Sequence, residues 1–403
     1  MNARATTRAP DPAASVSLRP PLRVVGLFAG IGGIEVGLHR AGHSTALLCE
    51  IDEGAAAVLR VRFPSAPLAR DIRTLDSLPN CDLVAAGFPC QDLSQAGRTA
   101  GIAGRNSGLV KRVFELVEDA EREPRWLLLE NVPFMLQLDR GDAMRYLARR
   151  LGELGYRWAY RVVDARAFGL PQRRQRVILL ASRTDDPRQV LFHGDEGEPE
   201  QRDHRGLACG FYWTEGIRGL GWAVDGVPTL KGGSTIGIPS PPAVWMPDGL
   251  IGTPDVRDAE RLQGFQPDWT APAAQLGRRG EGHRWKLVGN AVSVPVSEWV
   301  GRRLREPRPF DESLQAPLPS GSPWPSAAWG DTTGTWRVGF SHWPVHAPYQ
   351  SLAEFLRFPL KPLSERATAG FLRRTTESTL RFPEGLLDAV AAHLRAAQDR
   401  AAA

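Results

Sequence analysis

Residues 22–33 read LRVVGLFAGIGG, an apolar run that ends in a loop containing Gly30, Gly32 and Gly33. A continuous apolar run of this length is typical of a buried strand, and glycines let the backbone approach a ligand closely. A helical segment over 34–41 follows, and a second apolar strand over 44–49 ends at Glu50-Ile51-Asp52. Strand, glycine loop, helix, strand and acidic residue in this order predict a cofactor-binding βαβ unit.

The glycine loop differs from the dinucleotide-binding fingerprint, because a third glycine would be needed at position 35, which is Glu35. An acidic residue at the end of the next strand, here Glu50, suits hydrogen bonds from ribose hydroxyls. The loop alone is a weak signal, and a role in packing is its plain alternative. Together with Glu50, it favours cofactor binding.

Strand and helix patterns alternate as far as about residue 183. Strands are expected over 81–86, 126–129, 157–164 and 176–181, and helices over 108–122 and 142–154. This alternation predicts an α/β fold with a mostly parallel sheet and helices on both faces. Ligands bind at the carboxyl ends of such strands. The residues at or near those ends should therefore converge on one cleft: Gly30, Glu50, Asp71, Cys90 and Glu130.

The regular pattern stops after residue 183. Residues 184–257 are rich in Gly, Pro and Trp and predict a smaller, irregular, β-leaning domain, and the α/β pattern returns over 258–305. Residues 306–325 are rich in Pro and Ser and are interpreted as a linker. A strand pair over 336–345 and a helical packing face over 386–394 follow, so 306–403 is a C-terminal extension of unknown role.

Composition narrows the class of protein. The 403 residues carry a net charge of +5, which favours a polyanionic partner such as nucleic acid. Four cysteines without metal-ligand spacing predict no metal site and no disulfide framework, as in a reducing cytoplasm. No segment has the length of apolar sequence that a membrane helix needs. Residues 1–21 lack the apolar core of a signal peptide and are interpreted as a disordered lead-in.

The segment Gly87-Phe88-Pro89-Cys90-Gln91 follows the apolar run 83–86 and places a cysteine at a strand end. A thiolate is a strong nucleophile when nearby positive charge lowers its pKa. The alternative, a buried structural cysteine, is the commoner role of an isolated intracellular cysteine. The rest of the chain decides between the two.

Six segments together resemble the DNA (cytosine-5) methyltransferases, in the family's order, over about 23–182 and 258–305. They are the glycine loop 28–33, GFPCQ at 87–91, ENV at 130–132, QRRQR at 172–176, ERLQGF at 260–265 and GNAV at 289–292. The resemblance implies an S-adenosylmethionine-dependent methyltransferase with a Rossmann-like sheet. It also assigns the segment 184–257 to target recognition.

The resemblance implies a covalent mechanism on cytosine. The Cys90 thiolate would attack C6, and Glu130 would contact the N3 and amino edge of the base. Arg174 and Arg176 would hold the base, the thiolate and Glu130 and would lower the thiol pKa, whereas Arg173 should face away from both. A surface role is the alternative for such arginines, and a helix-capping role is the alternative for Glu130.

Further site residues follow from the same resemblance. S-adenosylmethionine is expected to contact residues of five segments: Phe28, Gly30, Ile31, Gly33, Glu50, Ile51, Asp71, Ile72, Gly87, Pro89, Asn290, Ala291 and Val292. The target base must be flipped out of the duplex, and Gln91, Ser94 and the glycine-rich stretch 97–108 resemble the mobile loop that closes over it. Candidate contacts to DNA phosphates or guanines are Arg202, Arg205, Arg218 and Lys231.

The expected partner is double-stranded DNA, and the protein is expected to be a monomer. A tRNA cytosine-5 methyltransferase of the same family and a non-catalytic DNA-binding relative are the alternatives. The sizeable recognition segment favours duplex DNA, and none of the six segments is broken, which favours an enzyme. A cognate restriction endonuclease, a solitary regulatory role and defence-system partners are all compatible with the sequence.

Overall fold

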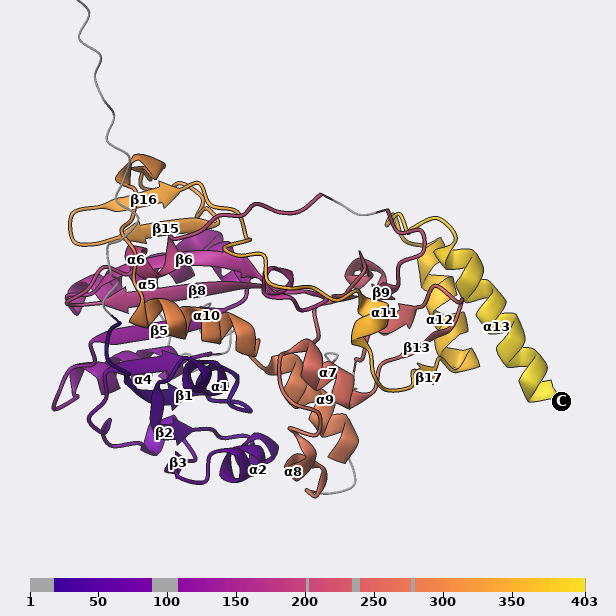
Figure 1. The fold of residues 1–403 in the computed structure, drawn as a ribbon, viewed down its shortest axis with the longest axis horizontal. Helices are drawn as coiled ribbons and strands as arrows, with labels where there is room; N and C mark the ends of the chain where they lie inside the picture. Colours follow the sequence, from indigo (N-terminus) through magenta and orange to yellow (C-terminus); the bar gives the residue numbers. More distant parts are fainter. Residues whose placement is uncertain (1–17, 89–107, 201–202, 234–239, 277–279, 403) are drawn as a thin grey trace, which may run out of the picture.

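The computed structural model describes residues 18–88, 108–200, 203–233, 240–276 and 280–402. Two lobes are joined by long crossing segments (Figure 1). The larger lobe is built on a ten-stranded sheet and the smaller one on a five-stranded sheet. No helix in the described part is long and apolar enough to cross a membrane.

The large sheet has the strand order β14-β16-β15-β6-β8-β5-β4-β1-β2-β3. Its strands are β1 Arg23–Leu27, β2 Ser44–Cys49, β3 Leu68–Ala69, β4 Leu83–Ala86, β5 Trp126–Asn131, β6 Arg157–Asp164, β8 Gln175–Ser182, β14 Gln315–Pro317, β15 Ala327–Gly330 and β16 Thr335–Val338. Strands β1 to β5 pair in parallel, whereas every pairing from β5 across β8 to β14 is antiparallel.

The expectation of a mostly parallel sheet was therefore wrong for this half of the sheet. Strands β6 and β8 are joined without a crossover helix, so they lie antiparallel, and β14 to β16 come from beyond residue 305. Strand β14 also lies within 306–325, where a linker was expected. Its backbone pairs with β16, so its Pro-containing sequence forms an edge strand.

Helices cover both faces of the large sheet because successive side chains of each strand point to opposite sides. Val25 and Leu27 of β1 join the core under α4 (Gly108–Glu118) and α5 (Asp142–Glu153). Val24 joins the core under α1 (Gly33–Arg40) and α10 (Val294–Arg305). The parallel strands are thus buried on both sides, and their carboxyl ends carry the loops of interest.

The small sheet has the order β10-β9-β12-β13-β17. Its strands are β9 Cys209–Phe211, β10 Trp222–Val224, β12 Ala243–Trp245, β13 Ile251–Thr253 and β17 Lys361–Pro362. Helices α12 (Glu365–Thr376) and α13 (Leu386–Ala402) pack beside it and bury Phe371, Leu386 and Val390 in the same core as Phe211. The second half of the C-terminal extension thus belongs structurally with the small sheet, although the domain boundaries drawn from the sequence stay predictions.

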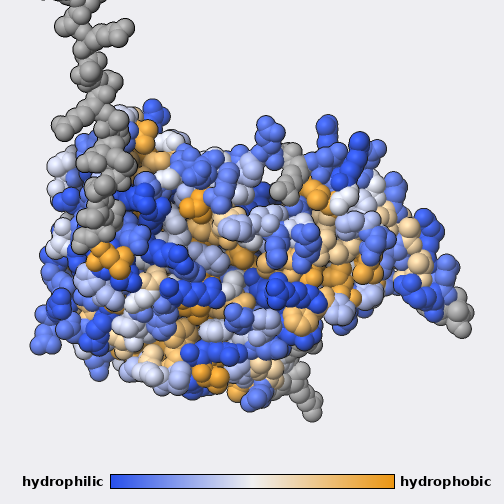
Figure 2. Space-filling view, viewed as in Figure 1, coloured by the Kyte–Doolittle hydropathy of each residue, from blue (hydrophilic) through white to orange (hydrophobic). Residues whose placement is uncertain are grey.

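The remaining elements lie in the connections between these strands and helices. They are α2 Glu53–Arg62, η1 Ile72–Thr74, η2 Pro133–Leu136, η3 Leu138–Gly141, η4 Ala165–Phe168, β7 Gln172–Arg173, α6 Arg188–Leu191, η5 Ile217–Gly219, β11 Val227–Pro228, α7 Val256–Leu262, α8 Ala271–Ala274, α9 Gly280–Asn290, η6 Glu312–Leu314 and α11 Leu352–Phe355. Strands β7 and β11 pair with each other between the lobes. Hydrophilic residues predominate on the face shown in Figure 2, and hydrophobic residues appear there in scattered patches.

Candidate active site

The loop after β1 has the conformation of a ligand-binding loop. Phe28 and Gly30 both have positive φ angles, 54° and 56°, and for a bulky non-glycine residue this conformation is strained. The Gly30 N–H donates to Oε2 of Glu50 at 2.8 Å. A side chain built on Gly30 would have no heavy atom within 4 Å of its Cβ. The loop therefore presents bare backbone to open space beside a carboxylate.

Glu50 lies at the carboxyl end of β2, where its other oxygen accepts from the Asp52 N–H at 2.7 Å. Burial raises the pKa of Glu50, and the hydrogen bonds from Asp52 and Gly30 oppose that shift. The next residue, Ile51, has 61% of its surface exposed. A half-buried, oriented carboxylate next to an exposed apolar side chain fits a ribose and the adenine attached to it.

Asp52 holds two distant elements together, although it belongs to none of the six segments of the family resemblance. Its Oδ1 caps α2 by accepting from Gly54 N at 3.0 Å and from Ala55 N at 3.1 Å. His283 and Lys286 of α9 contact the same carboxylate at 2.9 and 3.1 Å. Burial by itself would raise the pKa of Asp52, but these hydrogen bonds hold it below its ordinary value. The N-cap rule could have identified the residue, whereas its link to α9 is visible only in three dimensions.

The segment 290–292 lies against the glycine loop. A Cβ on Gly33 would clash with the Val292 carbonyl oxygen, so glycine is needed for this close approach. Ile31 and Ala291 are buried in one small core. Asn290 is exposed and lies against Gly232, where a Cβ would meet its side-chain oxygen. The first and the last segments of the family resemblance, 28–33 and 289–292, therefore meet at this loop.

Asp71 and Ile72, the two residues expected to contact adenine, both have side chains that are already engaged within the protein. The Asp71 carboxylate accepts from the Arg73 backbone at 2.9 Å and also pairs with the Arg73 guanidinium. Ile72 is only 4% exposed and belongs to the main core. Both lie at the end of β3, on the same sheet edge as Glu50, but their side chains already have partners.

Two of the predicted catalytic residues, Glu130 and Arg176, form an ion pair at the end of β5. Nε of Arg176, from β8, lies 2.8 Å from Oε1 of Glu130, and both side chains are about nine-tenths buried. A Cβ on Gly87 would lie 3.5 Å from Oε2 of Glu130 and 3.7 Å from Val292. Asn131 donates to the Phe88 carbonyl oxygen at 3.0 Å. The segments at 87–88, 130–131, 176 and 292 therefore meet in one place.

Arg174 has a different setting from Arg176. Its fully buried guanidinium donates to three carbonyl oxygens: Leu230 at 2.9 Å, Gly289 at 3.2 Å and Ala291 at 2.6 Å. Burial, and then Arg176, lower the pKa of Arg174 well below its ordinary value. Arg174 thus ties the small lobe to the segment after α9, and its side chain donates to no carboxylate among the described residues. Arg173 is exposed, as its alternating position predicted.

Glu35 is another buried carboxyl, at the position where the dinucleotide-binding fingerprint would have its third glycine. It is 1% exposed on α1, and a Cβ on Gly26 of β1 would clash with it. Its Oε2 has no hydrogen-bond partner among the described residues. Burial, opposed by its own backbone N–H and assisted by Glu50, raises the pKa of Glu35 to about 7. A carboxyl that is partly protonated near neutrality therefore lies beneath the glycine loop.

Several predicted residues lie outside the described part of the chain: Pro89, Cys90, Gln91, Ser94 and Arg202. For Arg218 the backbone is described, in η5, but the side chain is not. Of the remaining DNA candidates, Arg205 is exposed and lies 3.7 Å from Asp203 and 3.9 Å from Glu384. Nζ of Lys231 lies 3.3 Å from Oε1 of Glu215 and 4.1 Å from the centroid of the Tyr212 ring.

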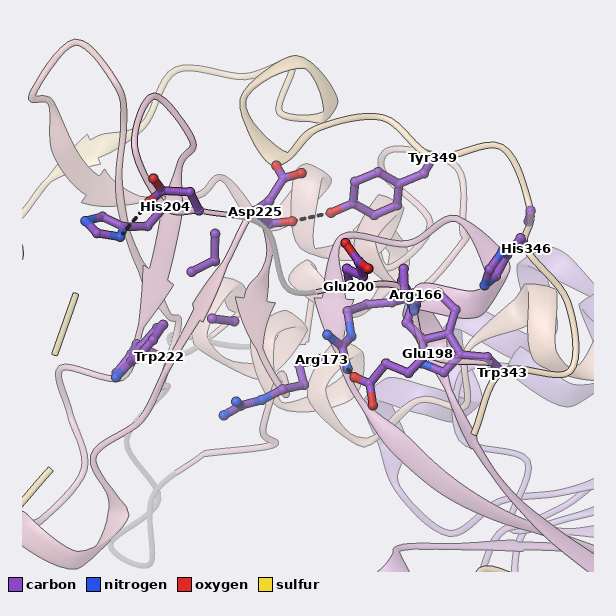
Figure 3. A pocket seen from close by; sticks show the side chains of 15 residues that line it. Arg166, Arg173, Glu198, Glu200, His204, Trp222, Asp225, Trp343, His346 and Tyr349 are labelled. Atoms are coloured by element: carbon purple, nitrogen blue, oxygen red, sulfur yellow. Dashed lines mark hydrogen bonds and ion pairs between the residues drawn. The ribbon is translucent and has the colours of Figure 1, made fainter. Parts of the chain in front are cut away.

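A cavity of about 590 Å³ lies between the lobes (Figure 3), and neither Glu130 nor Arg176 is among the residues that line it. Arg166, Trp343 and His346 line it from the large lobe, and Trp222 and His204 line it from the small one. Among the described residues, its lining shares only Arg173 with the segments of the resemblance. The described residues contain no group of three or more His, Cys, Asp or Glu side chains that could hold a metal ion.

Comparison with known proteins decides the family. The model of the C-5 cytosine-specific DNA methylases matches residues 22–206. Type II methyltransferase M2.BsuMI of Bacillus subtilis is 54% identical over 89% of this chain and 94% of its own length. The chain belongs to the C-5 cytosine-specific DNA methylase family.

Other relatives agree with this membership. Type II methyltransferase M.BsuFI of Bacillus subtilis is 34% identical over 71% of this chain and 73% of its own length. The Dnmt2 methyltransferase of S. pombe has a similar fold, with a TM-score of 0.51 and 18% identity, over 70% of this chain and 97% of its own. The predicted α/β methyltransferase fold and the predicted class, DNA (cytosine-5-)-methyltransferase, are confirmed.

Proposed function

We propose that the enzyme transfers a methyl group from S-adenosylmethionine to C5 of a flipped-out cytosine in a specific sequence of duplex DNA. The observation that carries this proposal is the Glu130–Arg176 ion pair beside Gly87 and Val292. It joins the strand end that leads to Cys90, the proposed base-contacting carboxylate and the cofactor loop. Such a convergence is what a methyl transfer between two bound molecules requires.

The residues present fit the cofactor. Gly30 offers open backbone, Glu50 an oriented carboxylate and Ile51 an exposed apolar face. We place the adenosine beside Glu50 and Ile51, with Asp71 and Ile72 at the adenine edge. Gly33, Gly87 and Val292 would hold the methionine part, with Phe28, Ile31, Pro89, Asn290 and Ala291 completing the site. When bound, S-adenosylmethionine supplies the methyl group that C5 accepts.

The side chains of this chain would carry the rest of the reaction. The Cys90 thiolate adds to C6 of the cytosine, which makes C5 nucleophilic. Glu130 contacts the N3 and amino edge, and Arg176 holds Glu130 in place. A base then removes the C5 proton, and the bond between Cys90 and C6 breaks as the aromatic ring is restored. Arg174 positions the backbone of 230 and 289–291 around this site.

Contacts to DNA are proposed on both sides of the target base. Gln91 and Ser94 would close over the flipped cytosine, and phosphates or guanines would be bound by Arg202, Arg205, Arg218 and Lys231. We also propose that the enzyme acts as a cytoplasmic monomer with a cognate restriction endonuclease. The Type II designation of M2.BsuMI supports the last point, and a role with defence-system proteins would require the same chemistry.

Bisulfite sequencing of plasmid DNA from a methylation-free bacterial host that expresses the chain tests the proposal. We expect protected cytosines within one short sequence, and complete loss of protection in Cys90→Ala with DNA binding still measurable. Cys81→Ala, which changes a buried cysteine, is the matched control and should keep the protection. Protection that persists in Cys90→Ala would overturn the covalent mechanism. Folded wild-type protein that protects no cytosine would overturn the DNA substrate.

Glu130→Gln separates the carboxylate's charge from its shape. Because the developing charge on the base would lose its partner, methyl transfer should fall by about 10³-fold while S-adenosylmethionine affinity stays unchanged. Single-turnover kinetics and calorimetry measure the two quantities. A rate within tenfold of the wild type would remove Glu130 from the mechanism.

A further inference from the structure

The C-terminal end of α12 lies against the first loop of the small sheet. Arg374, in the last turn of α12, donates from Nη2 to the carbonyl oxygen of Trp213. Trp213 lies in the loop that joins β9 to β10, directly after Tyr212. The C-terminal extension therefore reaches the segment in which target recognition is expected.

This loop leads toward the catalytic edge through a short series of contacts. The Tyr212 hydroxyl donates to the Thr229 carbonyl oxygen at 2.6 Å, and Lys231 lies over the Tyr212 ring. The backbone of Lys231 packs on Gly289 so closely that a Cβ there would clash with it. Arg174 bonds the carbonyl oxygens of both 230 and 289. The end of α12 thus contacts the same loop that reaches the backbone held by Arg174.

The charges at the end of α12 are unbalanced. Arg374 is half-buried and forms no ion pair with a carboxylate among the described residues, and Arg373 beside it is exposed and equally unpaired. Burial, and then Arg373, lower the pKa of Arg374. Glu377, the C-cap residue of α12, pairs with neither arginine in the described part of the chain. Two cations without an anion normally repel each other or bind an anionic partner.

Two buried donors at the same junction also lack acceptors. Nε of Arg374 and Nε1 of Trp213 have no hydrogen-bond partner among the described residues. Buried donors are nearly always satisfied in folded proteins, so two adjacent exceptions need an explanation. Both are donors and neither has an oxygen to bond. Donors therefore outnumber acceptors at this junction, which adds to the excess of positive charge at the end of α12.

We propose that the C-terminal end of α12, with Arg373 and Arg374, is a phosphate-binding part of the DNA interface. This inference rests on the proposed function, since the phosphates are those of the duplex whose cytosine is methylated. The contact is to the backbone and not to base edges, so it contributes affinity and orientation without reading sequence. It extends the DNA-binding surface from the segment 184–257 onto the C-terminal extension.

Binding of a duplex that contains the methylated sequence tests this proposal by fluorescence anisotropy, between about 50 and 200 mM salt. The variant is Arg373→Gln/Arg374→Gln in the full chain. The matched control is Arg395→Gln/Arg400→Gln on α13, whose neighbours His393 and Gln398 bond the opposite end of α12 at Leu363 and Glu365. Arg373→Gln alone changes an exposed side chain and serves if the double variant is poorly folded.

We expect the double variant to bind about tenfold more weakly and to lose about 1 to 2 from the slope of log affinity against log salt, roughly 0.9 for each phosphate contact. The preference for the methylated sequence over other DNA should not change, and the control should match the wild type. Wild-type affinity and slope in both α12 variants would overturn this proposal alone. A wild-type protein that binds no duplex would overturn the proposed function as well.

Discussion

The parallel half of the large sheet and the small sheet are assembled in different ways. In the parallel half, β1 to β5 follow one another along the chain, and their carboxyl ends bring the loops after Leu27, Cys49 and Ala86 together. In the small sheet, β13 pairs with β17, which lies 108 residues further along at Thr253↔Lys361. The first region is therefore encoded in short segments of sequence, and the second is closed only when the C-terminal extension returns to it.

Removing the Phe371 side chain tests how far the small sheet depends on that return. Phe371 is fully buried, with its ring centroid 4.9 Å from that of Phe211 on β9 and 5.9 Å from that of Phe382. Phe371→Ala should lower the free energy of unfolding of the small lobe by about 3–4 kcal/mol, because it leaves a cavity in the core. Urea titration followed by tryptophan fluorescence measures this change.

Phe134→Ala is the control for this experiment, since Phe134 is 58% exposed and its loss should cost less than about 0.5 kcal/mol. A loss of less than about 1 kcal/mol of unfolding free energy in Phe371→Ala would contradict this difference between the two sheets. It would mean that the strands of 209–253 hold together without the extension.

This difference explains what the sequence could predict. Glu50 and Glu130 could be placed at one edge because each ends a strand of the parallel half, where order along the chain becomes order in the sheet. The pairing of β15 with β6 could not be predicted, since no local pattern links Ala327 to Arg161. Non-local pairing depends on packing of the whole lobe, which periodicity does not report.

Glu35 offers a test of the parallel half itself. Its folded pKa of about 7 exceeds the ordinary value of 4.5, so the folded protein binds the extra proton between these two values. The stability that the protonated Glu35 contributes is fully present below pH 4.5 and is lost as the pH rises to about 7. Over this window the loss should approach about 3 kcal/mol, at 1.36 kcal/mol for each pKa unit.

Glu35→Gln keeps the shape of the side chain and removes its titration. The variant should therefore be more stable than the wild type at pH 8 and should lack this part of the pH dependence. Chemical unfolding of both proteins at pH 5, 6, 7 and 8 measures it. Parallel pH profiles for the two proteins would show that Glu35 is ionised throughout and has a partner in solution.

The roles of the arginines were harder to predict than their places. Arg174 and Arg176 were expected to act together on the base and on Glu130, but only Arg176 pairs with Glu130. Arg174 lies outside regular strand structure, between β7 and β8, so strict alternation fails there and its side chain reaches backbone oxygens instead. A pattern of period two predicts orientation only within a continuous strand.

The smallest expected effect concerns Asp52, where the two ways of assembly meet. Its carboxylate caps α2 within the parallel half and binds His283 and Lys286 of α9, more than 230 residues away. Asp52→Ala removes both contacts and should cost about 1 kcal/mol of stability through the lost cap. Asp52→Ser keeps a capping oxygen and loses only the pairing with α9, so it should recover most of that stability.

If the link to α9 also sets the cofactor site, S-adenosylmethionine affinity measured by calorimetry should fall a few-fold in both variants, because a partly exposed ion pair is worth up to about 1 kcal/mol. An affinity restored in Asp52→Ser would confine the residue to helix capping and would leave the parallel half independent of α9.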